Sequence, residues 1–403
     1  MAETNSLLNC RTGNRTGVSN PPPSAEFLKN RVQVHLNSVF WKKRYMREDH
    51  GLFRKNILIM KNVKKIFFVA AIALLVVFVG FIEQYYRLEV CNFVSRDGES
   101  HSYYVYPDMS ADSLYCLMCM DYEVQSEDAW HAHSKHMLYQ QPQKGYYRFP
   151  AEMGNKHLIR RLQLGEETPI RLSFTQAVRT PAQLAGLMDK KLLLDSAEVL
   201  ERLTDKTYMA KFGLTPETAV CLFIPNTYEV YWTITPDQLF ARMHKEYQRF
   251  WNEERMAKAK KLGLTPTEVA TIASIIASET NKSFEYPTIA SIYINRLRKG
   301  IALQACPTVI FAVGDFSLRR VLKRHLAIDS PYNTYKYRGL PPGPIRLARP
   351  EVIDAVLNAP KTDYLYMCAN PDFSGTHVFS SSYSKHSTVA REYQRELNKR
   401  KLK

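Results

Sequence analysis

The stretch TPTEVATIASIIASET, residues 265–280, has the pattern of one uninterrupted helix. It begins with a Thr that can cap the first turn, a Pro that presets this turn and a Glu that completes a capping box. Ile272, Ile275, Ile276 and Glu279 then share one face, and this face is otherwise apolar. A carboxyl group there is costly to ionise, so its pKa should rise, which suits a general acid. From spacing alone, a buried acid–Arg pair or an exposed helix end explains Glu279 equally well.

Three other helix starts have the same Thr-Pro form, at Thr180, Thr215 and Thr235. Gln or Glu at the third helical position completes a capping box after every one except Thr215, where we expect none. These signals are structural and imply no function.

The chain has 403 residues and a formal net charge of +16, from 55 Lys and Arg against 39 Asp and Glu. This excess favours an anionic partner, such as a lipid surface, an acidic polymer or a nucleic acid. No zinc-ribbon, RNP or helix-turn-helix signature accompanies the charge, so we expect no nucleic-acid partner.

The N-terminal part predicts a single membrane anchor. Residues 1–65 hold 13 Lys or Arg and 4 Asp or Glu. The 17 residues from Ile66 to Ile82 carry no charge, which is the short end of the length that spans a bilayer. Residues 83–128 hold 10 acids and two Arg, so the positive-inside rule leaves the N-terminus in the cytoplasm. We expect a basic, poorly ordered cytoplasmic tail at 1–60 and the anchor at 61–85.

A cleaved signal peptide is the alternative. No small-x-small cleavage site follows the apolar run, and Tyr85 and Tyr86 suit a membrane interface, so an uncleaved anchor is favoured. The stretch MKNVKKIFFVA, which starts at Met60, also resembles the start of a membrane-anchored protein. Translation from Met1 and from Met60 both remain possible.

Residues 90–170 read as strand, helix, helix, strand and helix, with the last helix ending at Gly165. This order predicts a small α+β module. Its cysteines and histidines, Cys116, Cys119, His131, His133 and His136, come close to zinc-finger spacing. However, the stretches SLYCLMCMDY and DAWHAHSKHML, which contain these cysteines and histidines, both have a helical pattern. Scattered positions on helix faces explain the cysteines and histidines better than a zinc site, so we expect no metal and no cofactor.

The region after residue 280 adds polar residues typical of a sugar site. EYPTIASIYINRLRKG, residues 285–300, predicts a helix that ends at Gly300 and carries Asn295 and Arg296 within its apolar stripe. The Pro- and Gly-rich loop SPYNTYKYRGLPPGPIRLARP, residues 330–350, combines aromatic faces with amide and hydroxyl groups. A tyrosine-rich structural turn is the alternative.

Several stretches together resemble the YceG family, also called MltG, of membrane-anchored endolytic lytic transglycosylases. They are IASETN, IYINRLRKGIALQACPTV, SPYNTYKYRGLPPGPI and YLYMCANPDFSGTHVFSSSYSKH, with PNTYEVYW at 225–232. The resemblance covers about residues 86–400 and includes a weaker similarity of residues 100–165 to a LysM-like subdomain.

The resemblance implies cleavage of the MurNAc–GlcNAc β-1,4 bond within peptidoglycan strands, leaving 1,6-anhydroMurNAc ends. The catalytic glutamate of the family falls on Glu279. One carboxyl group suffices for such a lytic reaction, whereas glycosidases that use water normally need two. The expected substrate-binding residues, by the same match, are Asn295, Gln304, Thr308, Tyr332, Asn333, Thr334 and Tyr335. His377 and His386 also fall on family histidines, although a lone His is more often structural.

The chain departs from the family pattern at two positions. Ala277 stands where relatives usually carry an acid, and Cys306 stands where they usually carry the Asp of LQ-x-DPT. The second departure puts in doubt whichever contact that Asp supplies. Two other functions therefore stay open: a non-catalytic peptidoglycan-binding protein, and a hydrolytic muramidase with Asp315 or Asp329 as the second carboxylate.

The sequence thus predicts an α+β protein with one transmembrane helix, a LysM-like subdomain at 90–170 and a catalytic transglycosylase domain at 171–403. We expect it in the inner membrane with its catalytic domain in the periplasm, acting on nascent glycan strands to terminate or trim them. Cell-wall synthases are the expected protein partners, by analogy alone.

Overall fold

The structure, a computed structural model, describes residues 25–137, 139, 141–318 and 320–399. Its fold is mixed α+β, as expected, and the chain separates into two compact units at residues 85 and 86.

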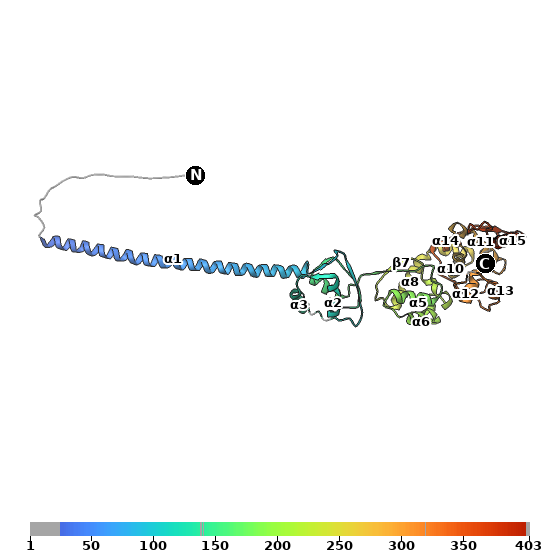
Figure 1. Cartoon of the computed structure of the whole chain (residues 1–403), viewed down its shortest axis with the longest axis horizontal. Helices are drawn as coiled ribbons and strands as arrows, with labels where there is room; N and C mark the ends of the chain where they lie inside the picture. The colour runs from blue at the N-terminus through green and yellow to red at the C-terminus, as the bar shows by residue number, and fades with distance from the viewer. Residues whose placement is uncertain (1–24, 138, 140, 319, 400–403) are drawn as a thin grey trace, which may run out of the picture. The chain divides into compact units, whose positions relative to one another are not determined.

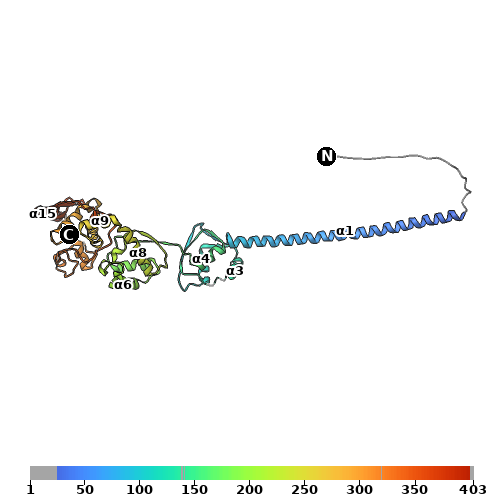
Figure 2. The same ribbon diagram turned by 180° about the vertical axis from the view of Figure 1, so that it is seen from behind.

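The first unit is dominated by α1 (Ala25–Glu89), a continuous helix in the views from both sides (Figure 1, Figure 2). Its segment Arg54–Glu89 is long and apolar enough to cross a membrane. Phe67 and Leu74 in this segment are 73% and 70% exposed, so no protein core covers them. A lipid environment would satisfy such a surface.

The expectation of a poorly ordered tail is wrong for residues 25–60, which belong to α1. Residues 25–60 contain no Pro, and Gly51 is their one Gly, so no strong helix breaker interrupts this stretch. Residues 1–24 lie outside the described residues.

The second unit begins with a small module of short strands and three helices. Its elements are β1 (Phe93–Ser95), β2 (His101–Val105), α2 (Ala111–Asp121), β3 (Tyr122–Val124), α3 (Glu127–His136), β4 (Gly145–Phe149), β5 (Glu152–Met153) and α4 (Asn155–Leu164). The strands form two antiparallel sheets, in the order β3-β1-β5 and β2-β4. The predicted order is confirmed by β2, α2, α3, β4 and α4, and Gly165 ends α4 in the left-handed conformation.

The core of this module is largely aromatic. Phe93 is fully buried and meets Trp130 edge to face at 5.4 Å. The Cys and His positions weighed for zinc serve the module in other ways: His133 Nδ1, for example, lies 2.7 Å from Asn155 Nδ2 and joins α3 to α4. Within the described residues, no three Cys, His, Asp or Glu side chains form a group that could hold a metal.

The next lobe has its own apolar core around Leu184, Val199, Phe223 and Phe240. Its elements are β6 (Ile170–Ser173), α5 (Pro181–Lys191), α6 (Ser196–Thr204), α7 (Lys206–Ala210), the 3-10 helix η1 (Pro216–Leu222), β7 (Thr227–Val230) and α8 (Pro236–Phe250). Strands β6 and β7 pair antiparallel.

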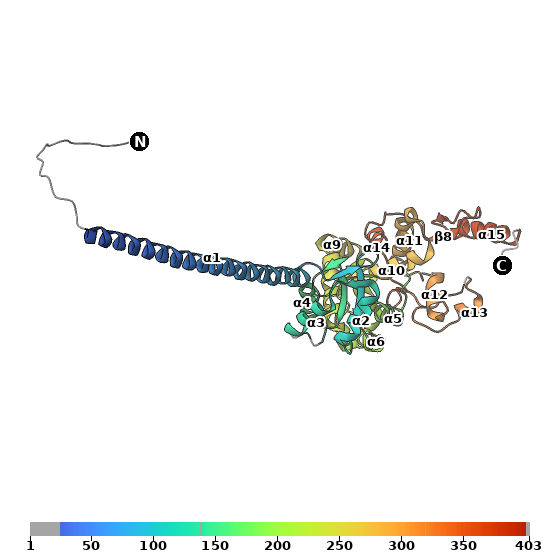
Figure 3. The same cartoon turned by 60° about the vertical axis from the view of Figure 1, so that its left-hand side comes forward.

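The C-terminal lobe is built around α10 (Pro266–Glu279), which packs against α9, α11, α12 and α14, and Figure 3 shows the last three of these around it. The remaining elements are α9 (Glu253–Leu262), η2 (Ser283–Glu285), α11 (Tyr286–Arg298), α12 (Cys306–Val313), α13 (Lys323–Leu326), α14 (Pro350–Leu357), β8 (Tyr366–Ala369), β9 (His377–Ser380) and α15 (Tyr383–Lys399). Strands β8 and β9 form an antiparallel hairpin against which α15 packs.

All four Thr-Pro sites begin helices, and the capping boxes at Thr235 and Thr265 are present as predicted. The box predicted at Thr180 is incomplete: the Thr180 hydroxyl accepts the Gln183 N–H, but the Gln183 side chain accepts the Arg179 N–H at 2.8 Å and not that of Thr180. The prediction that Thr215 has no box is wrong: the Thr218 hydroxyl accepts the Thr215 N–H at 2.9 Å. At the third helical position, the Thr hydroxyl therefore accepts the N-cap N–H in place of the expected Gln or Glu side chain.

Residues 343–347 join the two larger lobes. Leu347 N–H donates to Val178 O at 3.0 Å, and Arg346 donates to Gln176 O at 2.6 Å and to Ala277 O at 3.1 Å. Gly343 lies so close to η1 that a Cβ there would meet Glu217 O at 2.0 Å. A side chain at position 343 would therefore push the two lobes apart.

Candidate active site

Helix α10 brings Glu279 to the edge of a fully packed core. Its residues from Val269 to Ala277 are all buried, so the helix is enclosed and does not have the single apolar face that the sequence suggests. Glu279 is the last helical residue and is half-buried. The following Thr280 leaves the helical conformation, and its N–H donates to Ile276 O at 3.3 Å.

Glu279 has the electrostatic setting of a tunable acid. The Tyr293 hydroxyl donates to Glu279 Oε1 at 2.9 Å. Burial raises the pKa of Glu279 to about 6, against the lowering effects of this hydrogen bond and of the nearby His377. The pKa of Tyr293, 1% exposed, is pushed well above its ordinary value by burial and by Glu279, so its hydroxyl stays a donor.

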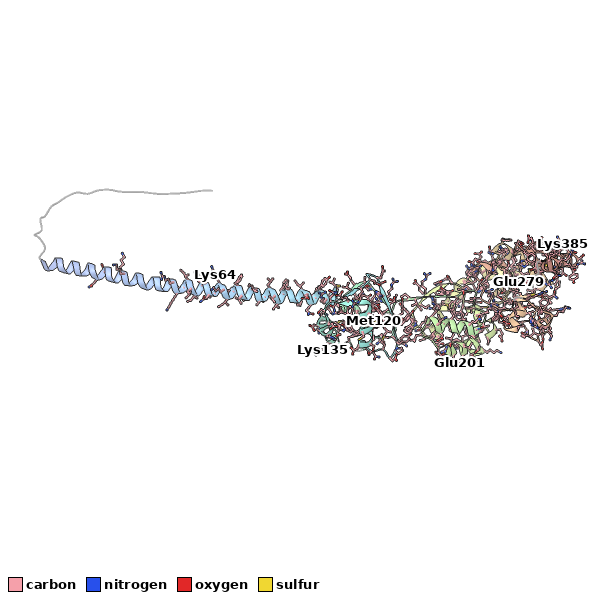
Figure 4. All side chains as sticks on the ribbon, viewed as in Figure 1. Lys64, Met120, Lys135, Glu201, Glu279 and Lys385 are labelled. Carbon is pink, nitrogen blue, oxygen red and sulfur yellow. The ribbon has the colours of Figure 1, made fainter. Side chains whose placement is uncertain are left out.

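Glu279 opens onto a cleft of about 520 Å³. Figure 4 labels Glu279 in the same lobe as Lys385 of α15. The cleft is lined from α10, α11, the start of α12, the loop after α13, the β8–β9 hairpin and α15, by Glu279, Ile292, Tyr293, Arg296, Leu303, Gln304, Cys306, Tyr335, Leu365, Tyr366, Met367, Cys368, Ala369, His377, Tyr383 and His386. Among these described residues, Glu279 is the one carboxylate.

Arg296 fixes the floor of the cleft. It is 6% exposed and donates to Ala302 O at 2.7 and 2.9 Å, to Leu365 O at 2.9 Å and to Gln304 Oε1 at 2.6 Å. Burial lowers the pKa of its guanidinium, although an arginine still stays charged. Gln304 has a φ of 54°, a conformation that costs a non-Gly residue energy, and the Arg296 bond stabilises it there.

Cys306, one of the two positions at which we expect a departure from the family pattern, lines the cleft. Its Sγ lies 3.2 Å from the Tyr335 hydroxyl. Burial is the largest effect on this thiol and raises its pKa, so near neutral pH Cys306 supplies no negative charge. Cys306 thus brings a polar contact to Tyr335 but no negative charge to the cleft.

Of the eight residues expected in the site, the structure brings Glu279, Gln304 and Tyr335 together on the cleft. The other five do not line it. Thr308 and Thr334 are buried and joined through their hydroxyls at 2.8 Å, and Thr334 also accepts the Ala305 N–H at 3.0 Å. They hold the segment before α12 against the loop after α13.

Asn333 is fully buried, and its amide donates to Leu326 O at 2.9 Å and to Ile328 O at 2.8 Å. Tyr332 packs its ring on Phe311 with centroids 4.6 Å apart. Both residues therefore shape the loop from inside.

Asn295 faces a different cleft, of about 750 Å³, on another face of α11. Its amide donates to Thr362 O at 2.7 Å and to Tyr364 O at 3.1 Å, which connects α11 to the segment before β8.

His377 and His386 both line the cleft. Nδ1 of His377 lies 3.0 Å from Oε2 of Glu285, which is 2% exposed. His386 stacks on Tyr366 with centroids 5.3 Å apart, and its buried Nδ1 has no hydrogen-bond partner among the described residues.

The carboxylates weighed as a second catalytic acid lie elsewhere. Asp315 accepts the Ser317 N–H at 2.9 Å, and Asp329 accepts from Lys336 Nζ at 2.7 Å. Neither lines the cleft with Glu279.

Sequence reasoning missed Tyr293, Glu285 and the β8–α15 residues Tyr366 and Tyr383. Tyr293 occupies an apolar helix face and carries no sequence signal of a role. For Arg296 a signal existed, because a lone Arg within an apolar helical stripe must find buried partners.

Comparison with known proteins gives consistent matches. The model of the YceG-like family matches residues 103–392, which include the whole cleft. A Bacillus subtilis protein named endolytic murein transglycosylase is 28% identical over 285 residues, 67% of this chain and 78% of that protein. A Streptococcus pneumoniae protein of the same name (strain D39) is 26% identical over 301 residues, 66% of this chain and 53% of that protein.

Among solved structures, a YceG-like protein from Listeria monocytogenes is similar, with 26% identity and a TM-score of 0.48. The similarity covers 72% of this chain and 99% of that one.

Proposed function

Because the chain belongs to the YceG-like family, we propose that it is an endolytic murein transglycosylase held in the membrane by α1. The substrate is the glycan strand of peptidoglycan, cut at the MurNAc–GlcNAc β-1,4 bond. The observation that carries this proposal is the single carboxyl group on the cleft, Glu279, whose pKa is raised to about 6.

One carboxyl group can carry out the whole reaction. Protonated Glu279 gives its proton to the glycosidic oxygen, and the bond from this oxygen to C1 of MurNAc breaks. The C6 hydroxyl oxygen of the same MurNAc then bonds to C1, and its proton goes to the Glu279 carboxylate. The products are a GlcNAc hydroxyl and a 1,6-anhydroMurNAc end, and Glu279 regains its starting form.

The surroundings of Glu279 support both halves of this cycle. Burial favours the protonated form that the first step needs, while the Tyr293 hydroxyl stabilises the carboxylate left by it. A hydrolytic glycosidase normally needs a second carboxylate to activate water or to attack C1, and none lines this cleft among the described residues.

For substrate binding, we assign direct contacts to Gln304 and Tyr335, which line the cleft. Supporting roles, in which the side chains hold the loops that carry those contacts, go to Asn295, Thr308, Tyr332, Asn333 and Thr334. Tyr366 and Tyr383 add aromatic surface for the C–H faces of a sugar.

The remaining parts of the proposal concern location. We place the chain in the inner membrane with its N-terminus in the cytoplasm, because Lys and Arg precede the apolar segment and acids follow it. The module at 90–170 would bind glycan as a LysM-like subdomain. The anchor would confine cutting to new strands near the membrane, where cell-wall synthases act.

The test uses the full chain in detergent and its Glu279→Gln variant, each incubated with purified peptidoglycan. New ends are read by mass spectrometry. We expect anhydro-muramyl ends from the parent protein and a loss of at least about a thousandfold in the variant. Asp315→Asn is the matched control, an exposed carboxylate outside the cleft, and should leave the rate unchanged.

Other outcomes would replace the proposal. Reducing ends would identify a hydrolytic muramidase. Intact strands with every variant would favour a non-catalytic peptidoglycan-binding protein, with Cys306 as the change that disables the site.

A further inference from the structure

A second carboxylate, which does not line the cleft and which the reaction above does not use, contacts the cleft residue His377. Glu285, in η2, is 2% exposed. Its Oε1 accepts the backbone N–H of His377 at 2.7 Å, and its Oε2 accepts from the Thr280 hydroxyl at 3.0 Å and lies 3.0 Å from His377 Nδ1. A carboxylate this deeply buried is unfavourable unless it is paired or hydrogen-bonded.

Among the described residues, His377 is the ionisable partner of Glu285. Because Nδ1 faces Glu285, the proton on that nitrogen is fixed and the other ring nitrogen, Nε2, is left free. His377 also lines the cleft that contains Glu279. Thr280 directly follows Glu279 in the chain, so Glu285 ties the end of the catalytic helix and the histidine together.

We propose that Glu285 holds the His377 ring in place on the cleft wall, so that this imidazole, when it carries a proton, stabilises the Glu279 carboxylate once the Glu279 proton has left. His377 is thus a positioning residue that acts through Glu279, and Glu285 keeps its ring oriented. This inference rests on the proposed function for its catalytic meaning, but the charge coupling itself can be measured without any substrate.

Burial shifts the pKa values of several other titratable groups that line the cleft. Tyr293, Tyr335 and Cys306 have pKa values raised by burial, and Arg296 stays positive. On the opposite wall, burial raises the pKa of Cys368 and lowers that of His386, which leaves both neutral near pH 7.

Tyr366 and Tyr383 complete that wall with phenol groups.

The experiment measures the protonation of Glu279 directly. The full chain in detergent is treated with a carbodiimide and glycine ethyl ester at pH 4.5 to 8.5, and labelling of Glu279 is read by peptide mass spectrometry. The reagent attacks a protonated carboxyl group, so labelling falls as pH rises through the pKa of Glu279. The parent protein should show a midpoint near pH 6.

His377→Gln should move this midpoint up by about half to one pH unit, because a neutral amide no longer stabilises the carboxylate. His377→Lys keeps a cation and should leave the midpoint at or below that of the parent. His386→Gln, another imidazole of the cleft, should leave the midpoint in place.

The outcomes separate this inference from the proposed function. An unchanged midpoint in His377→Gln, with a folded protein by circular dichroism, overturns the inference and makes the pair a structural brace. A shifted midpoint supports it even if the parent protein cuts no peptidoglycan, and that failure would count against the proposed function alone. If the protein is active, the upper limb of its pH–rate profile should shift together with the labelling midpoint.

Discussion

The two walls of the cleft are built in different ways. The wall of α10 and α11 belongs to a closed core: every residue from Val269 to Ala277 is buried, and α10 is enclosed by neighbouring helices. The opposite wall of β8, β9 and α15 is thin. All four residues of β8 are half-buried, and α15 has no buried residue among those described.

This difference separates two tasks. The acid that must be held at one place lies on the rigid wall, where packing fixes its helix and a buried tyrosine fixes its oxygen. Aromatic and imidazole groups that line the cleft lie on the thin wall, which can adjust its side chains at little cost. His377 connects the walls, because it sits in β9 and is bonded to Glu285 beside α10.

The largest expected contrast is in stability. Ile276→Ala empties a fully buried site in α10 and should cost about 2–5 kcal/mol of unfolding free energy. Val378→Ala removes a half-buried side chain from β9 and should cost about 1 kcal/mol or less. Urea unfolding of both variants measures the contrast, and equal losses would mean that the two walls are equally rigid.

The next effect concerns the acid itself. The folded state raises the pKa of Glu279 from 4.5 to about 6, so its contribution to stability is complete below pH 4.5 and is lost as pH rises through 6. Glu279→Gln, which cannot ionise, should therefore be more stable than the parent by about 1–2 kcal/mol at pH 8 and equal to it at pH 4. Urea unfolding at both pH values checks this, and the same gain at pH 4 would refute the assignment of the shift to ionisation.

The smallest effect on stability is expected in α15. Tyr383 is 68% exposed at the cleft, so Tyr383→Ala should change the unfolding free energy by no more than about 0.5 kcal/mol. If the tyrosine contacts the glycan, KM should rise by about three- to tenfold while kcat stays nearly constant. Steady-state rates with soluble glycan strands measure both, and a loss of kcat alone would place Tyr383 in the chemistry instead.

The sequence predicted those parts of the fold whose signals are local. Thr265 and Gly300 mark the limits of α10 and α11 because a cap or a left-handed Gly acts within one turn. Strands β1, β3 and β5 were not predicted, because each has two or three residues, too few for an alternation of apolar and polar residues to appear. The full length of α1 was also not predicted, since a polar helix without helix breakers has a composition similar to that of a disordered tail.

For the site, the sequence could give residue types but not the direction in which they point. Asn333 and Tyr335 come from one loop, yet the Asn333 amide turns inward to Leu326 O while Tyr335 faces the cleft. Composition cannot distinguish these fates. Glu285 and His377, 92 positions apart, meet only through the folded hairpin, so no local pattern reveals their pair.

The joint at residues 343–347 has a consequence for how the molecule unfolds. Leu347 belongs to the core of one lobe and Ile345 to the core of the other, and both are tied by backbone or buried side-chain bonds. If either core unfolds, the contacts of residues 343–347 with both cores are disturbed. The two lobes should therefore melt as a single cooperative unit, although each has a hydrophobic core of its own.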